Sequence, residues 1–307
     1  MIRLDDIQVF VQTADAGSFS AAARQLDITP ALASTAVQRL EREVGTRLFL
    51  RSTRSMRLSD DGERYLEHAR AALSAVAAGH QALAQGRGEI AGLLRLSAPS
   101  DLGRNALAPW LDEFQALHPK ISLHLRISDR AVDLLRHPVD AGVRYGALDD
   151  SSLVAQPLAP ENRRALCASP AYLERHGLPA VPEDLRAHNC LRFVWGDHIH
   201  ERWAFHLPRG VQTVTVAGDR VSDDADVVRR WAVAGHGIVY KSRLDLSDDL
   251  ATGRLVDIFP EAHCEPAPLN LVTADRSQLS PMILALRDFL RDKCTKLRKP
   301  TLDGAAA

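Results

Sequence analysis

Arginine is concentrated in one short stretch near the start of the chain, where it could hold phosphate groups. Between residues 39 and 57 there are six arginines, and only Glu41 and Glu43 oppose them, which leaves an excess of four positive charges. The whole chain, by contrast, carries a net charge of −1. Guanidinium groups form charge-assisted hydrogen bonds with phosphate oxygens, so the stretch fits a nucleic-acid backbone. The alternative is a charged surface that meets only water.

Two short helices are predicted before this stretch. Apolar residues recur at helical spacing from Leu4 to Ala14, and Gly17 is a typical residue to end that helix. Ser18 is a favourable N-cap for a second helix that runs from Phe19 to about Leu26. Both helices precede the arginine-rich region and would support it.

A third helix is predicted after a short turn. Thr29 caps it, and Pro30 takes the first helical position, where its missing N–H costs nothing. The helix runs to about Val44, before Gly45. A helix, a three-residue turn and a second helix make a helix-turn-helix. Its expected buried residues are Leu32 or Ala33, Ala36, Val37, Leu40 and Val44.

The opposite face of the third helix carries small and polar side chains. Ala31, Ser34, Thr35 and Gln38 share that face, and Arg39 lies beside it. Small residues let a helix sit deep in a major groove, and Ser, Thr and Gln can bond base edges. The alternative is a solvent-exposed helix in any helical domain.

A β-hairpin is expected directly after the third helix. Residues 47–51 and 56–59 are two short apolar pieces around a turn of Arg, Ser and Thr. Arg51, Arg54 and Arg57 would then lie against phosphates or reach into a minor groove. Together these elements predict a winged helix-turn-helix.

Residues 1–62 resemble the signature of LysR-type transcriptional regulators almost continuously. The matching residues are Gly17-Ser18-Phe19-Ser20-Ala21-Ala22-Ala23, Leu26, Thr29-Pro30, Ser34, Leu40-Glu41, Gly45, Arg47-Leu48-Phe49, Arg51 and Leu58-Ser59-Asp60-Asp61-Gly62. The resemblance implies sequence-specific binding to double-stranded DNA. Many members carry Ser-Gln where this chain has Thr29-Pro30, so a base preference does not carry over. The DNA-binding residues expected from pattern and resemblance are Ser20, Thr29, Pro30, Ala31, Ser34, Thr35, Gln38, Arg39, Arg51 and Arg54.

A long helix is expected over residues 60–87. Apolar positions alternate in steps of three and four, as in a coiled coil: Leu66, Ala69, Leu73, Val76, His80 and Leu83. We interpret them as a dimerisation seam, which is the role of this segment in LysR-type regulators. The alternative is an amphipathic helix that lies on its own domain. Three glycines in residues 85–92 then mark a linker, and we place the domain boundary near residue 88.

The remaining chain alternates strands with helices, which predicts a parallel sheet covered by helices. Strands at 93–97, 121–127 and 140–144, with helices at 102–117 and 131–136, form one unit. A second unit starts near residue 163, and the strand 269–273 with the helix 281–297 returns to the first. We therefore expect a winged helix-turn-helix (1–59), a linker helix (60–87) and a two-lobed α/β domain (88–300). Lobe I covers about 91–160 plus 266–297, and lobe II about 161–265; the pair resembles the periplasmic-binding-protein fold.

A small-molecule site is expected between these lobes, at strand ends and helix N-termini. The candidate residues are Pro99, Ser100, Arg126, Ser128, Phe193, Trp195 and Ser222, with Ser222-Asp223 predicted to cap a helix from 224 to 234. Each could instead be a plain cap or a core side chain. The family's effectors are often carboxylates or aromatic acids, which suits this site. Asp101 at the predicted rim would oppose such an anion.

Catalytic and metal-binding patterns are absent from the sequence. It holds no Gly-x-Ser-x-Gly elbow, Walker loop, Gly-x-Gly-x-x-Gly or His-Glu-x-x-His motif. His198 and His200 could share a strand face around a metal, but no carboxylate or thiol completes a set. The four cysteines show no Cys-x-x-Cys spacing, and residues 1–6 contain no apolar signal core. We expect a cytoplasmic protein without cofactors, with no catalytic residues and no membrane partner.

These observations predict a LysR-type regulator whose DNA binding responds to a small-molecule effector. Its expected partners are double-stranded DNA, the effector, further copies of itself in a dimer, tetramer or larger assembly, and RNA polymerase. The main alternative is a solute-binding or sensing protein whose N-terminal helices only pair subunits. A third hypothesis is an α/β enzyme with a helical appendage, which would turn over a substrate.

Overall fold

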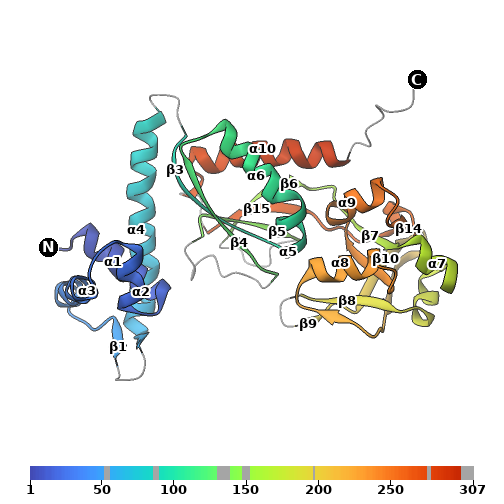
Figure 1. Ribbon diagram of the computed structural model, residues 1–307, viewed down its shortest axis with the longest axis horizontal. Coiled ribbons are helices and arrows are strands. Elements are labelled where there is room, and N and C mark those ends of the chain that lie inside the picture. Colours follow the sequence, from blue (N-terminus) through green and yellow to red (C-terminus); the bar gives the residue numbers. More distant parts are fainter. Residues whose placement is uncertain are drawn as a thin grey trace. The chain divides into compact units, whose positions relative to one another are not determined.

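A computed structural model describes residues 1–51, 56–85, 90–129, 139–146, 153–195, 198–274 and 278–298 (Figure 1). The chain forms two compact units that divide between Glu89 and Ile90. No helix within those ranges is long and apolar enough to cross a membrane.

The first unit is a helical head with a small hairpin and one long helix. Its elements are α1 (Leu4–Ala16), α2 (Phe19–Gln25), α3 (Pro30–Val44), β1 (Phe49–Arg51), β2 (Met56–Leu58) and α4 (Asp60–Gln85). The predicted caps are confirmed: the side chain of Ser18 accepts a hydrogen bond from the Ala21 N–H, and that of Thr29 from the Leu32 N–H. Gly45 ends α3 in the left-handed conformation, at φ 76°. Local sequence signals therefore set the ends of these helices.

The core of the head joins all of its elements. Phe10 of α1 is fully buried, and its ring meets the Phe49 ring edge-on at 5.5 Å between centroids. The start of α4 passes close to the chain before the hairpin, and a Cβ on Gly62 would stand 2.1 Å from the Leu48 carbonyl oxygen. Only glycine allows this approach, so Gly62 fixes where α4 meets the head.

The second unit consists of two α/β lobes. Lobe I contains β3 (Gly92–Ala98), α5 (Ser100–Leu102), the π-helix η1 (Gly103–Leu107), α6 (Ala108–Leu117), β4 (Ile121–Ile127), β5 (Ala141–Tyr145), β6 (Val154–Ala159), β15 (Leu269–Thr273) and α10 (Pro281–Arg298). Lobe II contains β7 (Arg164–Ala168), α7 (Pro170–His176), η2 (Pro182–Ala187), β8 (Cys190–Trp195), β9 (His198–Ile199), β10 (Arg202–Leu207), β11 (Gly210–Thr215), β12 (Val221–Ser222), α8 (Ala225–Val233), β13 (Ile238–Ser242), α9 (Arg243–Ala251), β14 (Val256–Asp257) and η3 (Glu261–His263).

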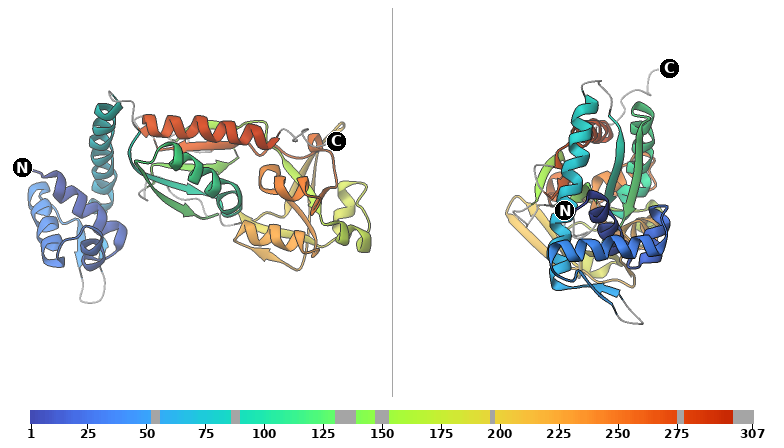
Figure 2. Two further views of the ribbon diagram at one scale, coloured as in Figure 1. Left: turned by 45° about the horizontal axis from the view of Figure 1, so that its top comes forward. Right: turned by 90° about the vertical axis from the view of Figure 1, so that its left-hand side faces the viewer.

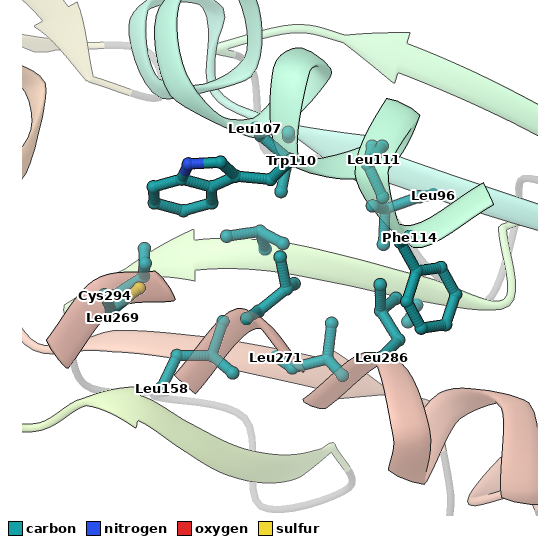
Figure 3. Close-up of a cluster of buried hydrophobic side chains, with 14 of the residues drawn as sticks. Leu96, Leu107, Trp110, Leu111, Phe114, Leu158, Leu269, Leu271, Leu286 and Cys294 are labelled. Carbon is teal, nitrogen blue, oxygen red and sulfur yellow. The ribbon is translucent and has the colours of Figure 1, made fainter. Parts of the chain in front are cut away.

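The sheet of lobe I has the order β4-β3-β5-β15-β6. The pairs β3–β4 and β3–β5 are parallel, as the alternation of strands and helices predicts, whereas β15 runs antiparallel to both neighbours. Helices α6 and α10 lie side by side over one face of this sheet (Figure 2). Between them and the strands lies the apolar core, in which Trp110 and Phe114 of α6 face Leu271 and Leu286 (Figure 3).

Lobe II is built on a sheet of order β12-β8-β13-β7-β14, with the hairpin β10–β11 beside it. Helix α8 packs on one side through Val228 and Ala232, while Trp203 and Phe205 of β10 pack with Tyr240 in a separate core. Strands β6 and β10 and helix α9 are absent from the sequence-based expectation. The helix expected at 131–136 lies outside the described residues.

Candidate functional site

The exposed face of α3 agrees with the predicted one in most positions. Ala31, Thr35 and Gln38 are exposed and Ser34 is half-buried. The sequence left open whether Leu32 or Ala33 belongs to the core. Ala33 is buried whereas Leu32 is 58% exposed, so the core residue is Ala33. Ser20 in α2, and Thr29 and Pro30 at the start of α3, are also exposed. The helix thus presents one continuous surface that begins at its N-terminus.

Arg39 is half-buried, and its guanidinium is held by a carboxylate inside the head. Its Nε donates to Asp6 Oδ2 at 2.6 Å, and a second guanidinium nitrogen contacts the other carboxylate oxygen. Asp6 is only 2% exposed. Two parallel hydrogen bonds to a buried carboxylate hold α3 against α1, so this arginine positions the recognition helix.

A carboxylate of α3 holds the base of the wing. Glu41 Oε1 accepts hydrogen bonds from the N–H groups of Leu48, at 2.9 Å, and Phe49, at 3.1 Å. The expected hairpin is confirmed, with antiparallel pairing of Phe49 with Leu58. This geometry couples the direction of the wing to that of α3.

Cationic side chains surround this surface. Arg42, Arg47 and Arg57 are exposed. The side chain of Arg51 and the whole of Arg54 lie outside the part of the chain that the structure describes. The sequence-based list of DNA-binding residues leaves out all three, although Arg57 was expected against phosphates and the count of charges over residues 39–57 included all of them.

The predicted dimerisation seam divides into two parts. Leu66 and Ala69 are buried in the core of the head, and Leu73 packs against it. The expectation that Leu66 and Ala69 meet a second chain is therefore wrong, because α4 uses them to cover its own domain. Leu73 is only half-buried, and its place in the seam stays a prediction. Val76, one turn further on, is 38% exposed. The side chains of His80 and Leu83 lie outside the described residues.

In the second unit, a carboxylate from the chain itself occupies the predicted anion position. Asp129 Oδ1 accepts from the Ser100 N–H at 2.7 Å, and its Oδ2 accepts from the Ser100 hydroxyl and, at 2.8 Å, from the Ala225 N–H. Ser100 belongs to lobe I and Ala225 is the first residue of α8 in lobe II. Asp129 therefore joins the starts of two helices from different lobes, as a ligand carboxylate would.

Asp101 does not line the rim of an open site, contrary to the sequence-based expectation. It is fully buried, and its two oxygens face Arg229 Nε at 2.9 Å and Lys241 Nζ at 2.6 Å. Burial raises the pKa of Asp101 to about 6, against the opposing effect of these cations. Because its charge is matched by two cations of lobe II, Asp101 does not repel an anion from the site. It holds the lobes together.

Further charged pairs cross the same junction. Arg104 of lobe I bonds Asp224 at 2.9 Å, and the Tyr145 hydroxyl donates to Asp245 at 2.6 Å. Lys241, only 2% exposed, lies between the carboxylates of Asp101 and Asp245. Burial alone would lower the pKa of Lys241, but the two carboxylates raise it, so the ammonium group stays charged. The described lobes are thus linked by a buried ionic network.

The other effector candidates are distributed around this junction. Pro99 occupies the N-cap position of α5 without a side-chain capping bond, and the Ser128 N–H donates to the Ala98 carbonyl at the end of β3. Phe193 stacks on His200 and lies with its ring centroid 5.9 Å from Lys241 Nζ. The Trp195 side chain lies outside the described residues.

Ser222 does not cap α8 as predicted. It ends β12, where it pairs with Phe193, and its hydroxyl accepts from the Asp224 N–H at 3.1 Å. The N-cap is Asp224, whose side chain accepts from the Asp226 and Val227 N–H groups. Residues 222–224 are Ser, Asp and Asp, and each of these residue types can cap a helix. Because Ser222 belongs to strand β12, the helix begins later and Asp224 is its cap.

Sequence reasoning also missed two groups at the junction. Asp129 follows the predicted Ser128 directly, and a carboxylate just after a strand end was a usable signal. No sequence signal pointed to Lys241, because it follows the apolar residues Ile238 and Val239 in β13 and belongs to no motif. Within the described residues, no cluster of three His, Cys, Asp or Glu side chains could hold a metal ion.

Comparison with known proteins covers both units. A family model described as the LysR substrate binding domain matches residues 87–295, and one for bacterial regulatory helix-turn-helix proteins of the lysR family matches residues 4–63. The probable HTH-type transcriptional regulator LtrA of Klebsiella pneumoniae is 38% identical over 98% of each chain. The HTH-type transcriptional regulator DmlR of Escherichia coli is 33% identical over 94% of this chain and 93% of its own. The solved structure of CrgA, a LysR-type regulator from Neisseria meningitidis, matches with a TM-score of 0.59 and 30% identity, covering 96% of this chain and 99% of the other.

Proposed function

The chain belongs to the LysR family of DNA-binding transcriptional regulators, and on this premise we propose that α3 reads bases while the wing holds phosphates. The observation that carries the proposal is the surface of α3, whose exposed side bears Ala31, Leu32, Thr35 and Gln38. A helix with this profile fits the major groove.

The chemistry of each exposed residue suggests its part in base recognition. The Gln38 amide can bond adenine through two hydrogen bonds, and the Leu32 side chain can touch a thymine methyl group. The Thr35 hydroxyl already donates to the Ala31 carbonyl at 2.9 Å. Its oxygen is therefore left as an acceptor, which favours the amino group of cytosine or adenine.

Phosphate contacts come from the surrounding cations. We assign them to Arg42, Arg47 and Arg57, which are exposed, and to Arg51 and Arg54 from the sequence pattern. Arg39 acts indirectly by fixing α3 through Asp6. Each phosphate contact adds to the salt dependence of binding, because a bound cation releases condensed counterions.

The second unit binds a small-molecule effector between its lobes, near Ser100, Ser128 and Phe193. An effector changes DNA binding only if it has different affinity for two arrangements of the protein. The exposed part of α4, from Val76 onward, is the surface on which we expect a second copy to pack, and two heads then span two half-sites. We further propose that the protein forms a tetramer or larger assembly, that it contacts RNA polymerase and that it is located in the cytoplasm. We infer that the protein acts by binding rather than by catalysis.

The test separates base readers from phosphate binders. Gln38→Ala should change the preference among duplex sequences, whereas Arg57→Gln should weaken binding to all duplexes and reduce the salt slope by about one. Both are measured by fluorescence anisotropy at several salt concentrations. Arg202→Gln, an exposed change in lobe II, is the matched control. A salt slope that Arg57→Gln leaves unchanged contradicts the assignment of the wing.

A further inference from the structure

The carboxylate of Asp129 accepts hydrogen bonds from both sides of the lobe junction. Its Oδ1 accepts from the Ser100 N–H at 2.7 Å, and its Oδ2 accepts from the Ser100 hydroxyl and, at 2.8 Å, from the Ala225 N–H. Ser100 and Ala225 are buried, whereas Asp129 is half-buried. Three donors therefore converge on one carboxylate, which is an arrangement that would equally hold the carboxylate of a ligand.

The end of β4 fixes the backbone from which Asp129 projects. In the parallel pair of β3 and β4, Ser97 lies opposite Arg126, which is itself exposed. The Ser128 N–H then donates to the Ala98 carbonyl at 2.9 Å. The backbone is thus hydrogen-bonded up to the residue before Asp129. Because this strand end is already ordered, little further entropy is lost when the side chain reaches across the junction.

A comparison with Arg104 shows what distinguishes Asp129. Arg104 bonds Asp224 at 2.9 Å, so that contact across the junction joins two charged side chains. Asp129 instead contacts a backbone N–H of lobe II, that of Ala225. A backbone N–H can serve a carboxylate of the chain or one that is free in solution. The carboxylate of the chain has the advantage of a high effective concentration, so Asp129 competes strongly with free anions.

We propose that Asp129 is a tethered substitute for a ligand carboxylate, which joins the two lobes when no effector is bound and keeps acidic groups away from Ser100 and Ala225. The inference deepens the proposed function and rests on it, since it concerns an effector that acts between the lobes. The donors of Ser100 and Ala225 are already used, so an acidic group gains no hydrogen bonds there unless Asp129 moves away.

The first experiment asks whether a free carboxylate can replace that of Asp129 in the full chain. Asp129→Ala keeps the Cβ and removes the carboxylate, so formate is the probe that matches the lost group. Tryptophan fluorescence in urea follows the second unit, which holds all four tryptophans. We expect Asp129→Ala to lower the urea midpoint and formate to restore at least half of the loss. Formamide, or chloride at equal ionic strength, should restore none of it, and formate should affect the wild type no more than chloride does.

Duplex binding then distinguishes a regulatory contact from a merely structural one. Asp129→Ala should bind duplex DNA with altered affinity, and formate should shift that affinity by about fivefold or more toward the wild-type value. Asp184→Ala is the matched control. The Asp184 carboxylate also accepts from two backbone N–H groups, those of Ala180 at 2.9 Å and Val181 at 3.1 Å, but all of these residues belong to lobe II. Formate should leave the duplex affinity of Asp184→Ala unchanged.

Several results would overturn the proposal. They are a urea midpoint of Asp129→Ala that formate does not raise, an equal recovery with formamide, and a duplex affinity of Asp129→Ala that formate does not change. If Asp129→Ala fails to fold, Asp129→Asn decides the question. It keeps the size of the side chain but replaces one acceptor oxygen by an NH2 group, so its duplex affinity should differ from that of the wild type. An unchanged affinity would overturn the proposal.

The same measurements separate this inference from the proposed function. If the wild type binds duplex DNA but formate has no effect on Asp129→Ala, only the role of Asp129 is overturned. If the wild type binds no duplex, the DNA-binding assignment is overturned. Recovery of the urea midpoint of Asp129→Ala by formate, and not by formamide, would then still support Asp129 as the substitute for a ligand carboxylate.

Discussion

Polar side chains are exposed to solvent on the head, whereas at the junction between the lobes they are buried and paired with one another. In the head, Gln38, Arg42 and Arg57 face solvent, and the buried polar contacts serve to orient α3 and the wing. At the junction, Asp101, Arg229 and Lys241 are matched with one another across the two lobes. The exposed side chains of the head can therefore contact DNA directly. A ligand at the junction, by contrast, would bind beside charges that are already paired with one another.

The largest effect should come from breaking that balance. Asp101→Ala leaves Lys241 and Arg229 buried without their shared carboxylate, which should cost about 3–5 kcal/mol of unfolding free energy. All four tryptophans, Trp110, Trp195, Trp203 and Trp231, lie after residue 90, so their fluorescence in urea follows the second unit alone. Asp248→Ala removes an exposed partner of Arg254 and should cost less than about 1 kcal/mol. Equal costs for both variants would contradict the role of the network.

A smaller effect is expected where α4 meets the head. Gly62→Ala places a Cβ against the Leu48 carbonyl and should destabilise the head by up to about 3 kcal/mol. Gly79→Ala, in the same helix but with no atom within 4 Å of the added Cβ, should instead stabilise by about 0.5–1 kcal/mol. Helical circular dichroism during heating measures both. A shift of the melting temperature in the same direction for both variants would contradict the tight approach at Gly62.

The two neighbouring arginines of α3 should separate stability from binding. Arg39→Ala leaves Asp6 buried without its partner and should cost about 1–2 kcal/mol, because the pair is half-exposed on the arginine side. Arg42→Ala should change stability by less than about 0.5 kcal/mol, yet weaken duplex binding at low salt. Melting curves and anisotropy on the same samples test this, and a stable Arg39→Ala variant would show that the ion pair is dispensable.

The smallest expected effect is a change in the pH dependence of folding stability. Burial alone would raise the pKa of Asp226, but hydrogen bonds from Arg230, Asn105 and Arg229 lower it to about 2, from an ordinary value of 3.8. A carboxyl group with a lowered pKa stabilises the fold above its ordinary value and loses that contribution as the pH falls toward 2. Asp226→Asn should therefore be less stable at pH 7 but lose less stability between pH 5 and pH 3. Parallel urea midpoints across that range would contradict it.

The sequence allowed much of the head to be predicted and little of the junction. Caps at Ser18 and Thr29 and the ending at Gly45 are local signals, and all three are confirmed. Contacts such as Asp101 with Lys241 join residues 140 positions apart, and no local pattern encodes them. The assignment of Leu66 and Ala69 to the dimerisation seam was wrong because apolar residues at helical spacing do not show which surface packs on them. Here it is the core of the head.

The most direct test is duplex binding by the full chain. Fluorescence anisotropy is measured with the intergenic DNA beside its own gene, at two salt concentrations, with unrelated DNA as competitor. We expect binding that survives the competitor and weakens as salt rises. Absence of binding even at low salt would contradict the account, since the exposed face of α3 would then have no partner in DNA.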